Sequence, residues 1–276
     1  MTRLSVVITV CNEGHLLRAC LESVKWADEI VIVDMHSQDD SAALYRQYTD
    51  KVFFHPREII AELVHNFGFS KATGDWVLKL DPDERVLPAL GEAIRRVIAS
   101  ESEFAAYRLP FRDMIFGRWI QYTGWQGNRT VGLVRLFQRE KVTWVPEVHS
   151  TPQIDGPIGA IVYDPRLDNA VLHLNYTDIA QYLEKFNRYT TAEAMRLHRL
   201  GRPFHWLKLF YQPGKEFFRR YVQLQGYRDG IHGLILSLLQ SFYIMVSYMK
   251  LWEIETRPAA QSVASPQDAS GKTAAI

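Results

Sequence analysis

Two aspartates at the end of an apolar run are the residues of this chain best suited to chemistry. The run WVLKL, residues 76–80, follows Gly74 and predicts a buried strand, and Asp81 and Asp83 come directly after it. In open α/β sheets, ligands bind at the edge where the strands end. Carboxylates crowded there repel one another unless a cation lies between them. The pattern predicts a divalent metal site for a phosphate-bearing substrate, with an acidic surface turn as the alternative.

Further strands are needed to position these acids. Residues 4–10 (LSVVITV) and 29–33 (EIVIV) are largely apolar and β-branched, residues 51–54 (KVFF) predict a short third strand, and the segments between them have helical spacing. This alternation predicts βαβ units and a mostly parallel sheet. From residue 104, short strands with Pro and Gly turns predict a more antiparallel region, and from Asp178 the pattern becomes helical.

Polar residues also end the first two predicted strands. Asn12 and Glu13 follow the first strand, and Asp34 follows the second, so we expect them on the same sheet edge as Asp81 and Asp83. Side chains there can hold a base and a ribose, while the later carboxylates hold a metal on a diphosphate. The chain contains neither GxGxxG nor GxxxxGK[ST], so neither Gly-rich phosphate grip is supported.

Composition narrows the class of protein. The chain has 276 residues, 47% of them hydrophobic and 23% charged, which suits a globular core, and its net charge of +1 argues against a general nucleic-acid binder. Residues 188–228 carry nine Lys or Arg against two Glu, a balance of +7, which predicts contact with something anionic. Two cysteines, Cys11 and Cys20, make no disulfide framework and indicate a reducing cytosol.

The C-terminal third contains the most apolar stretch. Residues 231–252 are long enough to span a bilayer, and basic helices precede them. We expect an interfacial or partly inserted helix with basic residues on anionic lipid headgroups. A true span, a helix buried on the core and a homo-oligomer interface are the alternatives. The N-terminus lacks the features of a signal peptide.

Several of these segments carry a family resemblance. The segments SVVITVCNEGHLLRACLESV, ADEIVIVDMHSQDDS and NFGFSKATGDWVLKLDPDE resemble the inverting family 2 glycosyltransferases, which have the GT-A fold. The resemblance covers roughly residues 4–90. The chain as far as about residue 252 more loosely resembles lipopolysaccharide-core glucosyltransferases and related bacterial envelope-glycan transferases, through GWQGNRTVGLVRLFQR, VLHLNY and LEKFNRYTTAEA.

The resemblance implies an α/β architecture and a division of the chain. Residues 1–177 would form a GT-A domain, with a mostly parallel nucleotide-binding sheet flanked by helices. Residues 178–256 would form a basic, amphipathic and membrane-associating helical extension, and residues 257–276 a disordered tail. We expect a cytoplasmic protein that is peripheral on the inner face of the cell membrane.

The resemblance also implies residue roles. A nucleotide-sugar donor would be bound by Thr9, Asn12, Glu13, Asp34, Asn66, Lys71, Gly74, Asp81 and Asp83. Asp81 and Asp83 would hold Mg²⁺ or Mn²⁺ on the diphosphate, and His173 would be a third metal ligand or a diphosphate contact.

Two departures from the family pattern bear on mechanism. The loop after the second strand usually reads like DDGSTDGT, and here Met35 and His36 replace an acid and a glycine, which affects nucleoside selectivity. Ser150 stands where the subgroup often has Glu after His149, so the obvious catalytic base is missing. Glu147 and His149 are then the nearest candidates, and a phosphate acceptor would need no base.

The leading hypothesis is a metal-dependent inverting transfer from a nucleotide-sugar donor to a lipid-linked or envelope-glycan acceptor, at an anionic membrane surface and without nucleic acid. One alternative is transfer to a polyprenyl phosphate. Another is a sugar-nucleotide-binding scaffold that has lost catalysis.

Overall fold

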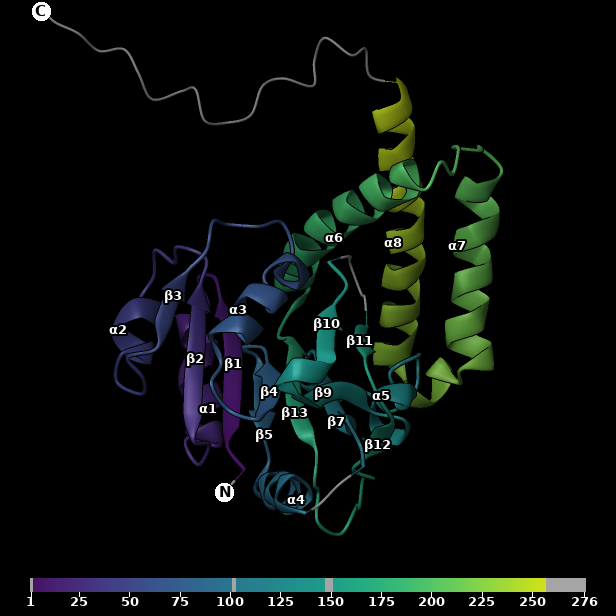
Figure 1. Cartoon of the computed structure of the whole chain (residues 1–276). Helices are drawn as coiled ribbons and strands as arrows, with labels where there is room; N and C mark the ends of the chain where they lie inside the picture. The colour runs from purple at the N-terminus through teal and green to yellow at the C-terminus, as the bar shows by residue number, and fades with distance from the viewer. Residues whose placement is uncertain (1, 101–102, 147–150, 257–276) are drawn as a thin grey trace, which may run out of the picture.

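The computed structural model describes residues 2–100, 103–146 and 151–256. In this part of the chain a central sheet has the strand order β12-β6-β9-β4-β1-β2-β3 (Figure 1). Its strands are β1 (Leu4–Val10), β2 (Glu29–Asp34), β3 (Val52–Phe54), β4 (Trp76–Leu80), β6 (Ala106–Leu109), β9 (Leu133–Gln138) and β12 (Ile158–Ala160).

The half of this sheet built from the N-terminal strands is parallel, as predicted. β1 pairs with β2 and β4, so that Val10 lies opposite Asp34 and Ile8 opposite Leu80. Every residue of these three strands is buried, which is why their sequences are apolar and β-branched with little alternation. β9 runs antiparallel to both β4 and β6, which confirms the antiparallel region expected after residue 104.

Helices cover both faces of the sheet, because successive strand residues point to opposite sides. On one face, α1 (Gly14–Val24), α2 (Ser41–Tyr45) and α4 (Pro88–Ala99) pack on the even-numbered residues of β1. On the other, α3 (His65–Lys71) packs with the short hairpin of β10 (Val142–Trp144) and β11 (Pro152–Ile154). The strand ends that carry the candidate acids are left uncovered by these two layers.

A second sheet starts at those acids. β5 (Glu84–Val86) begins directly after Asp83 and joins β13 (Val171–Tyr176), β7 (Phe111–Ile115) and β8 (Arg118–Trp119) in the order β5-β13-β7-β8. The register places His173 beside Glu84 on one side and beside Asp113 on the other. Three titratable residues far apart in sequence therefore form one row across the second sheet.

The remaining helices follow β13. The side chain of Asp178 accepts a hydrogen bond from the backbone N–H of Gln181 and caps α6 (Ile179–Arg199). Next come α7 (Lys208–Phe218), a π-helical turn η3 (Arg219–Gln223), a 3₁₀ turn η4 (Gly226–Asp229) and α8 (Ile231–Thr256). Figure 1 shows α7 and α8 side by side, with α6 crossing near the C-terminal part of α8.

Three short elements complete the described chain: η1 (Ala61–Leu63), α5 (Gln126–Thr130) and η2 (Arg139–Lys141). The expected tail, residues 257–276, lies outside the described residues.

Candidate active site

Asp81 and Asp83 lie in a tight turn between the two sheets. The backbone N–H of Asp81 donates to Glu84 Oε2 at 3.0 Å, and the backbone N–H of Glu84 donates to the Asp81 carbonyl at 2.9 Å. The turn therefore holds both aspartates at the carboxyl edge of β4. This is the position that the sequence predicts.

The chain supplies its own cations to these acids. Lys79 Nζ lies 2.5 Å from Asp81 Oδ2, and Arg135 contacts the same oxygen at 3.4 Å and Glu84 Oε1 at 2.7 Å. Burial would raise the pKa of Asp81, but the charges of Lys79 and Arg135 hold it well below its usual range. The expectation that these carboxylates would repel one another without an added cation is corrected: a lysine from β4 and an arginine from β9 lie beside them.

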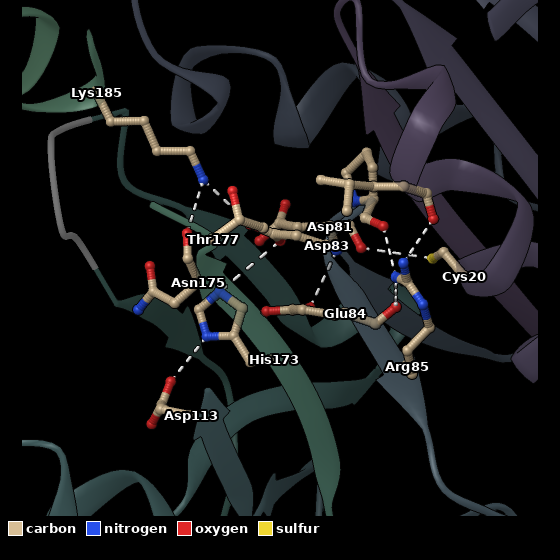
Figure 2. A network of polar contacts seen from close by, with 12 residues as sticks. Cys20, Asp81, Asp83, Glu84, Arg85, Asp113, His173, Asn175, Thr177 and Lys185 are labelled. Atoms are coloured by element: carbon tan, nitrogen blue, oxygen red, sulfur yellow. Dashed lines mark hydrogen bonds and ion pairs between the residues drawn. The ribbon is translucent and has the colours of Figure 1, made fainter. Parts of the chain in front are cut away.

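Asp83 has a separate set of partners, drawn in Figure 2. Lys185, from α6, lies with its Nζ 3.1 Å from Asp83 Oδ2 and also donates to the Asn175 carbonyl at 3.2 Å. His173 Nε2 lies 3.7 Å from Asp83 Oδ1. Asp83 is thus held between a helix of the C-terminal segment and the second sheet.

His173 also bonds a second acid. Its Nδ1 lies 2.8 Å from Asp113 Oδ1, and Asp113 is only 1% exposed. Burial lowers the pKa of His173, but the Asp83 charge and the hydrogen bond from the imidazole to Asp113 outweigh it and raise the pKa to about 9. At neutral pH the imidazole is therefore protonated, with Nδ1–H donating to Asp113 and Nε2–H directed toward Asp83.

Glu13 belongs to the same electrostatic environment. Burial raises its pKa, the negative charge of Asp83 raises it further, and Lys185 opposes both, with a result of about 7. The structure therefore brings Glu13 close to the two aspartates, as expected from the common strand edge.

The side chains of Asn12 and Asp34, which the sequence predicts to bind the nucleoside, form hydrogen bonds within one loop. Asp34 Oδ1 accepts from the backbone N–H and the hydroxyl of Ser37, at 2.9 and 2.7 Å, and Asp34 Oδ2 accepts from the Tyr45 hydroxyl at 2.8 Å. Asn12 Oδ1 accepts from the backbone N–H of Gln38 at 2.7 Å. Both side chains shape the loop, and their contact with a nucleoside stays a prediction.

Two of the other implied donor contacts have partners within the protein. The Asn66 amide donates to the Trp144 carbonyl and accepts from the Trp144 backbone N–H, each at 2.8 Å, and so fastens α3 to β10. Lys71 lies over the rings of Phe67 and Phe53, with Nζ 4.8 and 5.5 Å from the ring centroids. These contacts give both residues roles in packing α3.

Gly74 lies at the opposite end of β4 from Asp81. It precedes β4, whereas Asp81 follows it, and a strand of this length separates them by about 16 Å. Its N–H donates to Ser5 Oγ at 2.8 Å, and a Cβ there would lie 2.7 Å from that oxygen. These contacts give Gly74 a role in close packing, and its implied contact with the donor stays a prediction. Thr9, by contrast, is the penultimate residue of β1 and lies near the acidic edge.

The remaining predicted positions concern the base and the metal. Glu147 and His149 lie outside the described residues, so their role as the base stays a prediction. Within residues 2–100, 103–146 and 151–256, no group of three His, Cys, Asp or Glu side chains is arranged to hold a metal ion. The Asp81 side chain is directed to Lys79 while His173 faces Asp83.

Sequence reasoning missed four of the charged residues that complete the site: Lys79, Asp113, Arg135 and Lys185. Two of them had a local signal, because Lys79 and Arg135 interrupt the apolar runs WVLKL and GLVRLF. A charged residue within a buried strand requires a partner. Asp113 and Lys185 had no comparable signal, since each reaches the site only through the pairing of distant elements.

Comparison with known proteins agrees with this geometry. Residues 5–150 match the model of the family described as glycosyl transferase family 2. Over 265 residues, the chain is 27% identical to the lipopolysaccharide core biosynthesis glycosyltransferase LpsC of Rhizobium meliloti, covering 92% of this chain and 95% of the relative. It is 23% identical over 274 residues to an uncharacterized glycosyltransferase of Rickettsia typhi, covering 93% of this chain and 89% of the relative.

A solved structure supports the fold. The crystal structure of glucosyl-3-phosphoglycerate synthase from Mycobacterium tuberculosis superposes with a TM-score of 0.50 at 14% identity, over 73% of this chain and 81% of that one. The GT-A architecture predicted from the sequence is confirmed, with a large mixed sheet and helices on both faces. The family model covers more than half of the chain, and the chain belongs to glycosyl transferase family 2.

Proposed function

We propose that this protein transfers a sugar, with inversion, from a nucleoside-diphosphate sugar to a lipid-linked or other envelope-glycan acceptor. The family and the similarity to a relative named for lipopolysaccharide core biosynthesis support the class of reaction and acceptor. The observation that carries the proposal is the group of paired charges at the carboxyl edge of β4, where Asp81 and Asp83 meet lysine, arginine and histidine side chains.

These charges suit a diphosphate leaving group. Lys185 and the protonated His173 both face Asp83, so a diphosphate placed beside them would find two cations already in position. Such groups stabilise charge that develops during the reaction without having to reorganise. Arg135 and Lys79 neutralise Asp81, which limits its repulsion of the donor.

In the proposed reaction, an acceptor oxygen attacks the anomeric carbon from the face opposite the diphosphate. The bond from that carbon to the diphosphate oxygen breaks, and its electron pair leaves with the nucleoside diphosphate. The acceptor proton passes to a base, for which Glu147 and His149 are the proposed groups.

Asp81, Asp83 and His173 are the residues that would hold Mg²⁺ or Mn²⁺. Two carboxylates and an imidazole are ligands that Mn²⁺ accepts, and the bond between His173 and Asp113 is the outer support that ligating histidines commonly have. Such an ion would neutralise charge on the diphosphate. If these three side chains are to bind one ion together, the Asp81 carboxylate must release Lys79 and bind the ion, and His173 must lose its Nε2 proton.

At the nucleoside end we propose contacts from Asn12, Glu13 and Asp34. His36, which follows β2, stacks on Phe54 at the end of β3, with ring centroids 5.7 Å apart. Phe54 is 53% exposed, so this pair offers a nucleobase an aromatic surface. We therefore propose that His36, which departs from the usual family pattern of this loop, contributes to selectivity for the base.

Because the proposed acceptor is linked to lipid, we propose that the enzyme works on the inner face of the cytoplasmic membrane. A membrane association is supported by α8, the one helix of the described residues that is long and apolar enough to cross a bilayer. It is also supported by the relative's role in lipopolysaccharide synthesis.

Replacing both Asp81 and Asp83 by Ala tests the reaction. We expect sugar transfer to be lost, and the melting temperature to fall as well, because Lys79, Arg135 and Lys185 lose buried partners, so the assay uses variant protein that circular dichroism shows to be folded. Asp155→Ala, at an exposed carboxylate after β11, serves as the control. Full activity in the double variant would contradict the proposed donor site. Thermal stability should rise with one class of sugar nucleotide, and with Mn²⁺ beside it, because such ligands bind only the folded state.

The nature of the acceptor has its own test. If the acceptor is a hydroxyl, Glu147→Gln or His149→Ala should lower turnover by about a hundredfold or more. Unchanged turnover in both variants would instead favour a phosphate acceptor, such as a polyprenyl phosphate. No donor-dependent shift in stability and no transfer would favour a scaffold.

A further inference from the structure

Helix α8 turns its large apolar side chains outward. Its exposed residues Ile231, Leu238, Phe242, Met249 and Trp252 are 43–61% exposed. They are separated by seven, four, seven and three positions, a spacing that places them in one stripe along the helix. A helix on a water-soluble surface has the opposite arrangement, with large apolar residues against the core.

The inward face of α8 consists largely of small residues. Ser237, Ser241 and Ser247 are buried, and each hydroxyl donates to the carbonyl four residues earlier, at 2.7, 2.8 and 2.8 Å. Gly233 lies so close to Gly226 that an added Cβ would overlap the Gly226 carbonyl oxygen. Small residues at helix contacts and hydroxyls bonded within their own helix are typical of helices that face lipid.

Helix α7 continues the same outward apolar character. All eleven of its residues are at least partly exposed, and Phe210, Tyr211 and Phe218 are 53–73% exposed. Leu207, just before it, is also exposed. Because α7 packs beside α8, away from the central sheet, the two helices form one outer layer of the molecule (Figure 1). We call the outward side chains of α7 and α8 the α7–α8 surface.

Exposed basic residues in the same C-terminal segment indicate the kind of partner that this surface fits. Arg199, Arg202, Lys215 and Arg228 are exposed in the segment whose net charge is +7. Trp206, two residues before α7, and Trp252, near the end of α8, add aromatic side chains that suit the level of lipid headgroups. An exposed apolar face in a segment with an excess of exposed basic residues fits an anionic bilayer, whereas two copies of the same basic segment would repel each other in a symmetric dimer.

The packing of α8 also decides how it meets the bilayer. Near its start, Leu236 packs with Ile115 and Ile120, and near its end, Leu251 packs with Ala194 and Leu197. The helix is therefore attached to the rest of the protein at both ends of its length. If it crossed the membrane in this state, the attached sheet and α6 would have to enter the hydrocarbon with it.

We propose that the α7–α8 surface docks the enzyme on an anionic lipid bilayer, with both helices lying along the interface rather than crossing it. The proposal deepens the proposed function, since it gives the surface that would meet a lipid-linked acceptor. Binding to a bilayer can be measured without a nucleotide-sugar donor.

The test measures binding of the full chain to vesicles of phosphatidylcholine with and without phosphatidylglycerol. We expect binding only to the anionic vesicles, and each of Phe210→Ser and Phe242→Ser should weaken it by about tenfold, because a phenylalanine leaves the lipid. Val162→Ser is the matched control, since Val162 is 75% exposed outside the C-terminal helices. Lys215→Gln should weaken binding by about fivefold, while Lys25→Gln, exposed after α1, should not.

Three results would overturn the proposal. These are equal binding of the parent and both Phe variants, equal binding to neutral and anionic vesicles, and a parent that is dimeric in solution and becomes monomeric with Phe242→Ser. A fourth result would also overturn it: cleavage of the chain after residue 256 only by protease enclosed inside the vesicle would show a span. Vesicle binding by a protein that shows no donor-dependent stabilisation would contradict the proposed function while supporting the docking surface.

Discussion

Lys185 Nζ, on the first helix after the sheets, lies 3.1 Å from Asp83 Oδ2, although 102 residues separate the two in the chain. Burial lowers the pKa of Lys185, but the Asp83 charge more than compensates and raises it, so the side chain is a cation throughout the neutral range. The same C-terminal segment that contains the proposed docking helices thus places a charge beside Asp83, in the proposed donor site. Helix α6 therefore connects the proposed docking surface, through its packing on α8, with the proposed donor site.

Lys185→Met should weaken donor binding and transition-state stabilisation together. We expect kcat/KM for the donor to fall about tenfold to a hundredfold, because a charged contact with the diphosphate is lost. Lys185→Arg should recover part of the loss, and Lys141→Met, at an exposed lysine paired with Asp155, should have no effect. A drop in melting temperature with unchanged donor kinetics would show that Lys185 is only structural.

Asp113→Asn should lower the pKa of His173, because the imidazole loses its negatively charged hydrogen-bond partner. Without the Asp113 charge, the pKa of His173 should fall from about 9 toward its ordinary value of 6.5, which NMR of the imidazole can follow. We also expect the Mn²⁺ concentration for half-maximal transfer to rise about tenfold, the effect of removing the outer partner of a ligating histidine.

Asp168→Asn is the matched control for Asp113→Asn. Asp168 is also near the second sheet, but it pairs with Arg112 at 2.7 Å. An unchanged His173 titration in Asp113→Asn would contradict the assigned pairing.

Glu13→Gln should change how stability depends on pH. The pKa of Glu13 is raised from 4.5 to about 7 in the folded protein, so between these values the folded state holds more protons than the unfolded state. Glu13 therefore contributes stability that is fully present below about pH 4.5 and is lost as the pH rises through about 7.

The measurement is the free energy of unfolding of parent and Glu13→Gln, by urea denaturation at several values between about pH 5 and 8. The advantage of the parent over the variant should shrink as pH rises. Glu92→Gln, on the exposed side of α4, controls for surface charge. An advantage that grows with pH would contradict the burial of Glu13 beside Asp83.

Gly74→Ala should destabilise the fold without a direct effect on the donor. Its Cβ would lie 2.7–2.9 Å from Ser5 and Arg3, including backbone atoms, so we expect a loss of about 1–3 kcal/mol in the free energy of unfolding. Gly214→Ala, in α7 with no atom within 4 Å of the added Cβ, should be neutral or stabilising by up to about 1 kcal/mol. A large rise in the donor KM of Gly74→Ala with unchanged stability would support the donor role implied by the family resemblance.

Much of the fold was readable from local patterns. The runs at 4–10, 29–33 and 76–80 have no alternation because both faces of those strands are covered, and this predicts a parallel sheet with ligands at its carboxyl edge. The placement of Asp81 and Asp83 follows, since chain direction and strand end are local properties.

The residues that pair with Asp81 and Asp83 could not be predicted from the sequence. Lys185 and Asp113 reach the site through α6 and the second sheet, and no periodicity states which distant elements pair. The same limit concealed that Gly74, although its motif runs on to Asp81 in sequence, lies at the opposite end of β4. It also concealed the orientation of α8, because a helix apolar on nearly every side does not say which face will pack.

The sequence by itself thus determined the parallel strands and the acidic edge, because strand burial and chain direction are encoded within a few residues, and its motifs carried the resemblance to the family. Only the tertiary structure decided which cations meet the acids and which face of α8 remains exposed. Those outcomes depend on packing between segments about a hundred residues apart, where shape and charge complementarity act across space rather than along the chain.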